Sequence, residues 1–181
     1  MTDAPELRTA HLVLRRWRAA DRAPFAAMNA DPEVMEHFPA ALSQEQSDVM
    51  IDRIEAAFAA HGFGLWAVEV AATGEFIGFT GLSVPSFEAP FTPAVEIGWR
   101  LARPAWGHRY ATEAGRRALA SAFTDYGLAE VVSFTSVHNV RSQAVMRRIG
   151  MTHDPADDFD HPRLPPGHRV RRHVLWRARP G

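Results

Sequence analysis

The chain has 181 residues, of which 46% are hydrophobic and 23% are charged, and its formal net charge is −1 at pH 7. This length suits one domain with a substantial core. Nothing in this near-neutral charge balance indicates nucleic-acid binding, which would need a strongly basic face. The sequence contains no cysteine, which excludes disulfides, a thiolate nucleophile and cysteine-ligated metals.

The amino-terminal segment and the hydropathy of the chain bear on its compartment. The segment MTDAPELRTAHLVLRRW contains no apolar signal core and no cleavage pattern. No run of the chain approaches the ~18 consecutive apolar residues that a membrane-spanning helix needs. We therefore expect a cytoplasmic protein with no membrane partner.

The first third of the chain predicts one strand and two helices. Residues 12–14 have strand composition, and residues 21–29 predict a short helix. Ser43, with Gln46 three residues later, forms a capping-box pattern that predicts the start of a longer helix. Gly62 is the expected end of that helix, because glycine adopts the left-handed conformation of a helix C-terminus.

A hairpin and a connecting loop are expected next. Residues 65–70 and 76–82 read as strands, and the turn composition between them predicts a hairpin. The proline-rich residues 85–93 predict a loop.

The most regular pattern in the chain lies between Glu96 and Phe123, as a strand, a loop and a long helix. The strand alternates large apolar residues with Glu96, Gly98 and Arg100. In the helix, one buried face is predicted by apolar and small residues at i, i+3, i+4 and i+7: Ala111, Ala114, Gly115, Ala118, Leu119, Ala122 and Phe123.

The loop before this helix could bind an anion. The first backbone N–H groups of a helix lack partners within the helix and carry the positive end of its dipole. Gly107 would let a phosphate approach the backbone, and His108 and Arg109 would add donors and charge. An ordinary connection between a strand and a helix is the alternative interpretation.

The last third predicts a strand over residues 131–136, a helix over 141–149 that ends at Gly150, and a last strand over 170–176. Residue 151 begins a weak strand, and the polar, proline-rich loop that follows it is expected not to pack. The whole layout gives seven strands and four helices in one domain.

This order of elements, with the motifs EIGWRLARPAWGHRYATEA and NVRSQAVMRRIGM, resembles the GNAT superfamily of acetyl-CoA-dependent N-acetyltransferases. It is most similar to the branch of ribosomal-protein-alanine N-acetyltransferases. The resemblance implies a single α/β (α+β) domain over residues 7–178. It also implies a mixed, mostly antiparallel sheet of about seven strands, flanked by about four helices.

The resemblance implies acetyl-CoA as acyl donor, with no metal. The strand would bind the pantetheine arm through the backbone of Trp99, Arg100 and Leu101. The loop and first helical turn would bind the pyrophosphate through main-chain N–H groups of these residues: Gly107, His108, Arg109, Tyr110, Ala111 and Thr112. Asn139 would contact a pantetheine amide, and Ser142 would lie near the thiol.

Arg109 departs from the family, in which this position is normally glycine. If the position requires a positive φ, arginine is strained there by ~1–2 kcal/mol. If it does not, Arg109 can make a charge-assisted contact with a phosphate. We favour the second interpretation.

Two residues are candidates for proton transfer. Many family members have a tyrosine that protonates the leaving thiolate at the position of Met146, which cannot donate. Ser142 is our candidate for that acid, and a helix-capping serine is the alternative. Glu96 is the candidate base, acting through a water, and an ion pair within the sheet is the alternative. The backbone N–H near Trp99 would polarise the acetyl carbonyl.

Late in the chain, His161, His168 and His173 lack the fixed spacing and the additional carboxylate of a metal site. The resemblance instead places their segment beside the acceptor. The aspartates between residues 157 and 160 could attract a cationic amine, although a solvated acidic loop is the interpretation we favour.

The sequence therefore predicts an N-acetyltransferase that moves the acetyl group of acetyl-CoA to a primary amine of a protein N-terminus or a small molecule. Direct attack in a ternary complex needs no covalent enzyme intermediate. The alternative is a GNAT-fold sensor or scaffold that binds acyl-CoA without turnover. We expect a monomer or homodimer whose partners are acetyl-CoA and an amine acceptor, with no nucleic acid.

Overall fold

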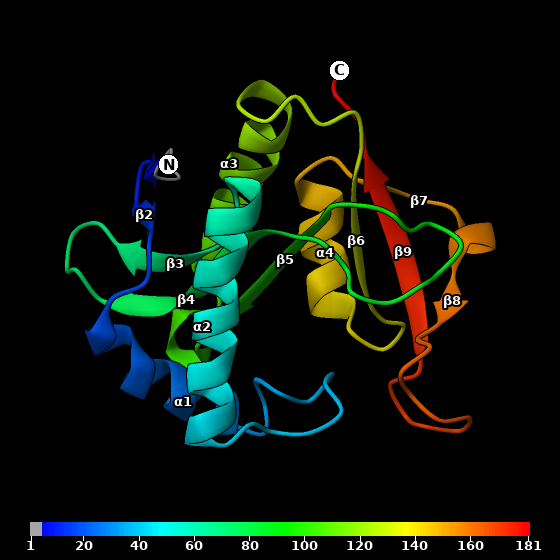
Figure 1. Ribbon diagram of the computed structural model, residues 1–181, viewed down its shortest axis with the longest axis horizontal. Helices are drawn as coiled ribbons and strands as arrows, with labels where there is room; N and C mark the ends of the chain where they lie inside the picture. Colours follow the sequence, from blue (N-terminus) through cyan, green and yellow to red (C-terminus); the bar gives the residue numbers. More distant parts are fainter. Residues whose placement is uncertain (1–4) are drawn as a thin grey trace.

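A nine-stranded sheet runs through the computed structural model, which describes residues 5–181 (Figure 1). Its order is β1-β2-β3-β4-β5-β6-β9-β7, and β8 pairs with β9 beside this path. The strands are β1 (Leu7–Arg8), β2 (Leu12–Arg15), β3 (Leu65–Val70), β4 (Phe76–Ser83), β5 (Glu96–Leu101), β6 (Val131–Ser136), β7 (Thr152–His153), β8 (Phe159–Asp160) and β9 (Arg172–Ala178). Residues 1–4, which belong to the segment inspected for a signal core, lie outside the described residues.

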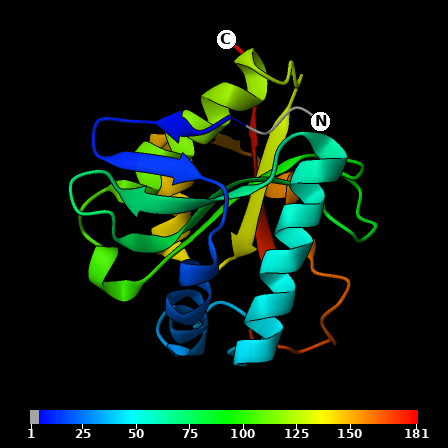
Figure 2. The ribbon, with the colours of Figure 1, turned by 60° about the vertical axis from the view of Figure 1, so that its left-hand side comes forward.

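Four α-helices cover this sheet, namely α1 (Arg22–Ala30), α2 (Gln44–His61), α3 (Tyr110–Thr124) and α4 (Val140–Arg148). Helices α1 and α2 lie on one face of the sheet, and α3 and α4 lie on the other (Figures 1 and 2). The predicted class, a mixed and mostly antiparallel sheet flanked by about four helices, is confirmed. Within residues 5–181 no helix has the length and apolarity to cross a membrane.

Local sequence signals set the ends of α2 as expected. Ser43 Oγ accepts a hydrogen bond from the Gln46 N–H at 3.1 Å, and Gln46 Oε1 accepts one from the Ser43 N–H at 2.8 Å, which completes the capping box. Gly62 ends the helix at φ +76°, in the left-handed region that favours glycine.

The sheet is antiparallel except between β5 and β6. These two strands pair in parallel at a single register position, Glu96 opposite Val132. Further along, the Ser133 hydroxyl still donates to the Ile97 carbonyl at 2.8 Å. No strand pairing joins β5 and β6 beyond this point in the described chain, so the sheet divides there into two halves.

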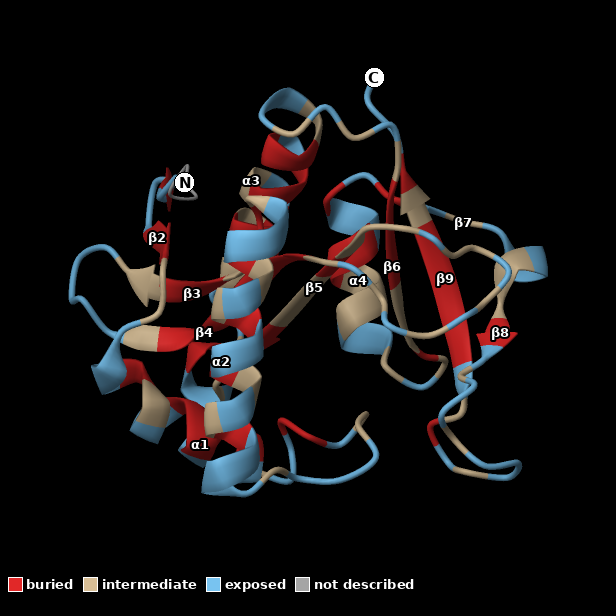
Figure 3. Cartoon of the chain, in the orientation of Figure 1, coloured by how far each residue is buried: buried red, intermediate tan, exposed pale blue. Residues whose placement is uncertain are grey.

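The face of α3 predicted to be buried does pack on the sheet. Its Ala114, Ala118 and Ala122 are fully buried, and a Cβ at Gly115 would lie 3.8 Å from the Trp99 indole on β5. Buried segments recur along α3 in Figure 3. Small residues on this face let the helix lie close to β5. This close packing fixes the α3 N-terminus beside the strand that precedes it.

The loop after β7 differs from expectation. It was expected not to pack, but it contains the short strand β8, and Phe159 is only 7% exposed. The Phe159 ring lies 4.9 Å from that of Phe91 and 5.6 Å from that of Phe134. The expectation was wrong because these aromatic partners are distant in sequence and are brought together only by the fold.

A buried ion cluster ties β2 to α1 and β3. Arg15 is 4% exposed, and its guanidinium donates two hydrogen bonds to the Asp21 carboxylate at 2.7 and 2.9 Å. Its Nε donates to Glu69 Oε2 at 2.7 Å. A buried cation needs such partners, because desolvation makes an unpaired charge expensive.

Replacing Asp21 with asparagine should therefore lower the free energy of unfolding by about 3 kcal/mol, since it leaves part of the Arg15 charge uncompensated. Urea denaturation measures this change. Asp52→Asn removes the partner of a solvent-exposed ion pair with Arg22 and should leave the free energy of unfolding nearly unchanged. Equal losses in the two variants would contradict the assigned importance of burial.

Candidate active site

A cavity of about 1010 Å³ lies where β5 and β6 separate. It extends from the N-terminus of α3, past the N-terminus of α4, to the loop between α1 and α2 and the segment before β9. Of the predicted donor-binding residues, the lining includes Trp99, Arg100, Leu101, Gly107, Arg109, Tyr110, Ala111, Thr112, Asn139 and Ser142. His108 is not part of the lining, and its ring stacks on Tyr110 at 5.2 Å.

One end of this cavity carries a run of free backbone donors. The six consecutive N–H groups of residues 107–112 have no acceptor among residues 5–181. An α-helix leaves its first N–H groups unpaired, and here the loop before α3 extends the run. Thr112 adds a buried hydroxyl that also has no partner within the described chain. Such a row of donors at the positive end of a helix suits a phosphate.

The conformation expected at Arg109 was wrong. The residue has φ +63°, so it occupies the left-handed region in which a non-glycine residue is strained by ~1–2 kcal/mol. Its side chain nevertheless lines the cavity. Arg109 therefore combines a strained backbone with a side chain that can reach a bound phosphate, two properties that were expected to be alternatives.

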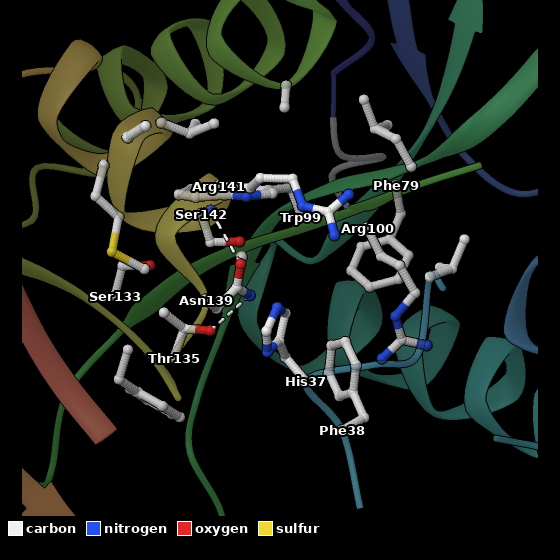
Figure 4. Close-up of a pocket in the computed structure, with 18 of the residues that line it drawn as sticks. His37, Phe38, Phe79, Trp99, Arg100, Ser133, Thr135, Asn139, Arg141 and Ser142 are labelled. Carbon is white, nitrogen blue, oxygen red and sulfur yellow. Dashed lines mark hydrogen bonds between the residues drawn. The ribbon is translucent and has the colours of Figure 1, made fainter. Parts of the chain in front are cut away.

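Asn139 caps α4 at the middle of the cavity. Its Oδ1 accepts a hydrogen bond from the Ser142 N–H at 3.1 Å, and its Nδ2 donates to Thr135 Oγ1 at 2.9 Å (Figure 4). Asn139, not Ser142, is thus the capping residue, and the capping alternative for Ser142 was wrong. The Ser142 hydroxyl has no hydrogen-bond partner in the described part of the chain. Met146 lines the same wall and is 1% exposed.

Comparison with known proteins identifies this architecture. The model of the acetyltransferase (GNAT) domain matches residues 11–152. The chain belongs to the GNAT acetyltransferase family. It is 35% identical to the FsC-acetyl coenzyme A-N(2)-transacetylase of Aspergillus fumigatus over 172 residues, which cover 90% of this chain and 72% of that relative.

Solved structures of GNAT acetyltransferases agree in fold. An acetyltransferase from Agrobacterium tumefaciens aligns with a TM-score of 0.78 and 28% identity, covering 97% of this chain and 95% of that one. RimL, a ribosomal alpha-N-protein acetyltransferase in complex with coenzyme A, aligns with a TM-score of 0.75 over 97% of this chain and 98% of that one. Its 16% identity shows a shared fold alone. Enzymes of the GNAT family take their acetyl group from acetyl-CoA, and this chain is an acetyltransferase of that kind.

Glu96 borders the cavity at the start of β5, where it faces few polar groups. Ser83 Oγ donates a hydrogen bond to its Oε2 at 3.3 Å, and no cation of residues 5–181 lies within salt-bridge distance. The ion-pair alternative for Glu96 was therefore wrong. Burial raises the pKa of the carboxyl from 4.5 to about 8, although the Ser83 hydrogen bond acts in the opposite direction.

Two of the three late histidines reach the cavity. The rings of His161 and His173 lie 5.2 Å apart, and both line it, whereas His168 does not. Burial, the neighbouring His173 and the Arg163 charge lower the pKa of His161 to about 4. Among the described residues no group of three or more His, Cys, Asp or Glu side chains is placed to hold a metal ion.

The aspartates of the same segment pair with other side chains. Asp157 accepts a hydrogen bond from Arg177 Nε at 2.8 Å, and Asp158 lies 2.7 Å from His153 Nε2. Asp160 faces Arg171 at 3.4 Å. These carboxylates are outside the cavity lining, so they do not attract an amine into it, in agreement with the interpretation favoured from the sequence.

Several lining residues were not predicted from the sequence. The loop between α1 and α2 contributes Glu33, Val34, His37, Phe38 and Pro39. No periodicity marks such a loop, and its position depends on contacts with distant parts of the chain. Arg100 did carry a signal, because a charged residue in a central strand is unusual. Only its backbone was expected to take part in binding.

The phosphate-binding role of the loop before α3 can be tested at Gly107. The residue has φ +84°, and a Cβ there would meet no atom within 4 Å. A valine would be strained and would project beside the free N–H groups, so the Kd for coenzyme A should rise about tenfold or more in calorimetric titration. Gly62→Val is the matched control, since Gly62 has φ +76°, equally open surroundings and no place in the cavity. An unchanged Kd for Gly107→Val would refute the assignment.

The raised pKa of Glu96 predicts a pH-dependent stability. The folded protein holds this proton more tightly than the unfolded chain does, so the associated stability is complete below about pH 4.5 and is lost as the pH rises through about 8. Glu96→Gln removes the charge, and its melting temperature relative to the parent should increase between pH 5 and pH 9. Each kcal/mol corresponds to about 2–4 °C in a domain of this size. Glu75→Gln, at an exposed turn, is the control, and a constant difference for Glu96→Gln would contradict the assignment.

Proposed function

We propose that this protein transfers the acetyl group of acetyl-CoA to a primary amine by direct attack within a ternary complex. The observation that carries the proposal is the continuity of one cavity. It joins the row of free N–H groups at α3 to the division between β5 and β6 and to the carboxyl of Glu96. The name of the Aspergillus fumigatus relative, an acetyl-coenzyme A N(2)-transacetylase, supports a nitrogen acceptor.

The donor would bind along the division in the sheet. The N–H groups of residues 107–112 and the Arg109 guanidinium would bind the pyrophosphate. The β5 backbone from Trp99 to Leu101 lies beyond the paired part of β5 and β6 and would bind the pantetheine arm as an additional strand would. Asn139 is held by Thr135 and the α4 backbone, which pre-orients its amide toward the cavity.

The chemistry then needs one base, one acid and one oxyanion donor. The amine nitrogen attacks the thioester carbon, a C–N bond forms and the C–S bond breaks. Glu96 in its ionised form accepts the proton of the amine through a water. The N–H near Trp99 stabilises the oxyanion. The Ser142 hydroxyl passes a proton to the departing thiolate while it takes one up from water, and the proton on Glu96 returns to solvent. Because Glu96 must be ionised, the rate should rise with pH through about 8.

The test is thiol release from acetyl-CoA in the presence of a panel of primary amines. Turnover with an amine, dependent on protein, is the expected result. Binding of coenzyme A without thiol release for any amine would support the acyl-CoA sensor instead and would refute the proposal.

Ser142→Ala should lower kcat roughly 100-fold while leaving the KM for acetyl-CoA within about twofold, because a general acid acts mainly in the transition state. Ser142→Thr retains a hydroxyl and should recover much of the rate. If Ser142→Ala keeps the parental kcat, the thiolate takes its proton from another group and Ser142 has no acid role.

A further inference from the structure

Arg100 is a buried arginine without a carboxylate partner. It is 9% exposed and lines the cavity from β5. Its Nη1 donates to Asn29 Oδ1 at 2.7 Å, and no Asp or Glu of residues 5–181 lies within salt-bridge distance of it. Its Nε is buried with no acceptor, and its Nη2 likewise has no acceptor in the described chain.

The guanidinium is held firmly in this unpaired state. Asn29 is fully buried and donates to Ser47 Oγ at 3.0 Å, and Ser47 in turn donates to the Ser43 carbonyl at 2.9 Å. The Arg100 guanidinium also lies 4.2 Å from the centroid of the Phe38 ring and 5.4 Å from that of Phe79. The group is thus pre-oriented at the cavity wall, opposite Asn139 and Ser142 (Figure 4).

A comparison within the chain shows how unusual this arrangement is. Arg15 is the other buried arginine of the described chain, and it contacts the carboxylates of both Asp21 and Glu69. Buried charges are ordinarily paired in this way, because an uncompensated one is destabilising. Burial lowers the pKa of Arg100 to about 10, in keeping with its lack of a counter-charge.

The cavity lining holds another arginine whose hydrogen bonds go to neutral groups. Arg163 lines the cavity, and its Nη2 donates to the carbonyl and hydroxyl of Ser86 rather than to a carboxylate. Of the two acidic residues in the lining, Glu33 pairs with Arg103, and Glu96 lies at the other end of β5 from Arg100. An anion at Arg100 would therefore find a donor that no carboxylate of residues 5–181 occupies.

The donor phosphates are not the anion that this site fits. Arg100 contacts Asn29 of α1 and Phe38 of the following loop, on the sheet face that carries α1 and α2. The free N–H groups of residues 107–112 belong to the start of α3, on the opposite face. An anion bound at Arg100 would therefore come from the second substrate.

We propose that Arg100 binds a carboxylate of the acceptor, so that the acetylated amine belongs to an amino carboxylate. This inference rests on the proposed function and narrows its acceptor to one chemical class. Glu96 and Arg100 share one face of β5, and four residues of strand separate their Cα atoms by roughly 13 Å. The acceptor would lie between them, with its amine toward Glu96 and its carboxylate on the guanidinium.

The experiment measures acetylation of a series of ω-amino acids of increasing length, from glycine to 6-aminohexanoate, and of α-amino acids. Each acid is compared with its carboxamide. For the best acceptor, kcat/KM should be at least about tenfold higher for the carboxylate than for the amide, since a hydrogen bond to a charged group is lost in the amide. The length of the ω-amino acid at which this ratio is greatest measures the distance between the position of the reacting amine and the Arg100 guanidinium.

Arg100→Met, which is close in shape and lacks the charge, should bring the ratio of carboxylate to amide near one. Arg100→Lys, which keeps a charge without the planar fork, should give an intermediate ratio. Arg8→Met removes an exposed arginine that lies, with its partner Glu6, outside the cavity, and it should retain the parental ratio. The carboxylate and the amide are compared on the same variant, so a general loss of activity does not affect the ratio. If a variant fails to fold, the ratio measured for the parent protein still tests the proposal.

The outcomes separate the two proposals. If the parent acetylates the amides as well as the carboxylates, or acetylates only polyamines such as spermidine, the acceptor class is wrong and the acetyltransferase stands. If no amine releases thiol, the proposed function fails. In that case, calorimetric titration of the same carboxylates with coenzyme A present decides the Arg100 site. Binding that is lost in Arg100→Met supports the site, and absence of binding to the parent overturns it.

Discussion

The separation of β5 and β6 after one parallel register pair is the constraint on which the rest of the molecule depends. A continuous ladder would pair these strands along their length and fill the space with backbone hydrogen bonds. The division instead leaves a cavity lined by β5, α3 and α4. Helix α3 follows β5 after a short loop, so its free N–H groups face the same opening.

Local patterns in the sequence predicted most of the framework. The alternation along β5, the small-residue face of α3 and the capping box at Ser43 depend on neighbours within a few residues, and all three are present in the structure. The short strands β1 and β8 were not anticipated, because a two-residue strand has no period to detect. Phe159 was missed for a related reason, since its partners lie far away in the chain.

The site was harder to predict than the fold, because its chemistry depends on environment. The motif placed most donor-binding residues on the cavity wall. The glycine that is usual at the position of Arg109 pointed to its positive φ, but the interpretation without strain was favoured, and it was wrong. No pattern in the sequence indicates that Glu96 has no cationic side chain within salt-bridge distance among the described residues. The burial of Arg100 depends on Asn29, 71 residues earlier, and on a loop without periodicity. The environments of Glu96 and Arg100 both arise from contacts between segments that are distant in the sequence.

The cavity draws its walls from both faces of the sheet, with Ala111 and Thr112 from the α3 side and Phe38 and Phe79 from the α1 side. A substitution in the first turn of α3 and one in the loop after α1 can therefore change the shape of the same cavity, although they lie on opposite faces of the sheet. The two helical layers are coupled in this way through the space in which the substrates would meet.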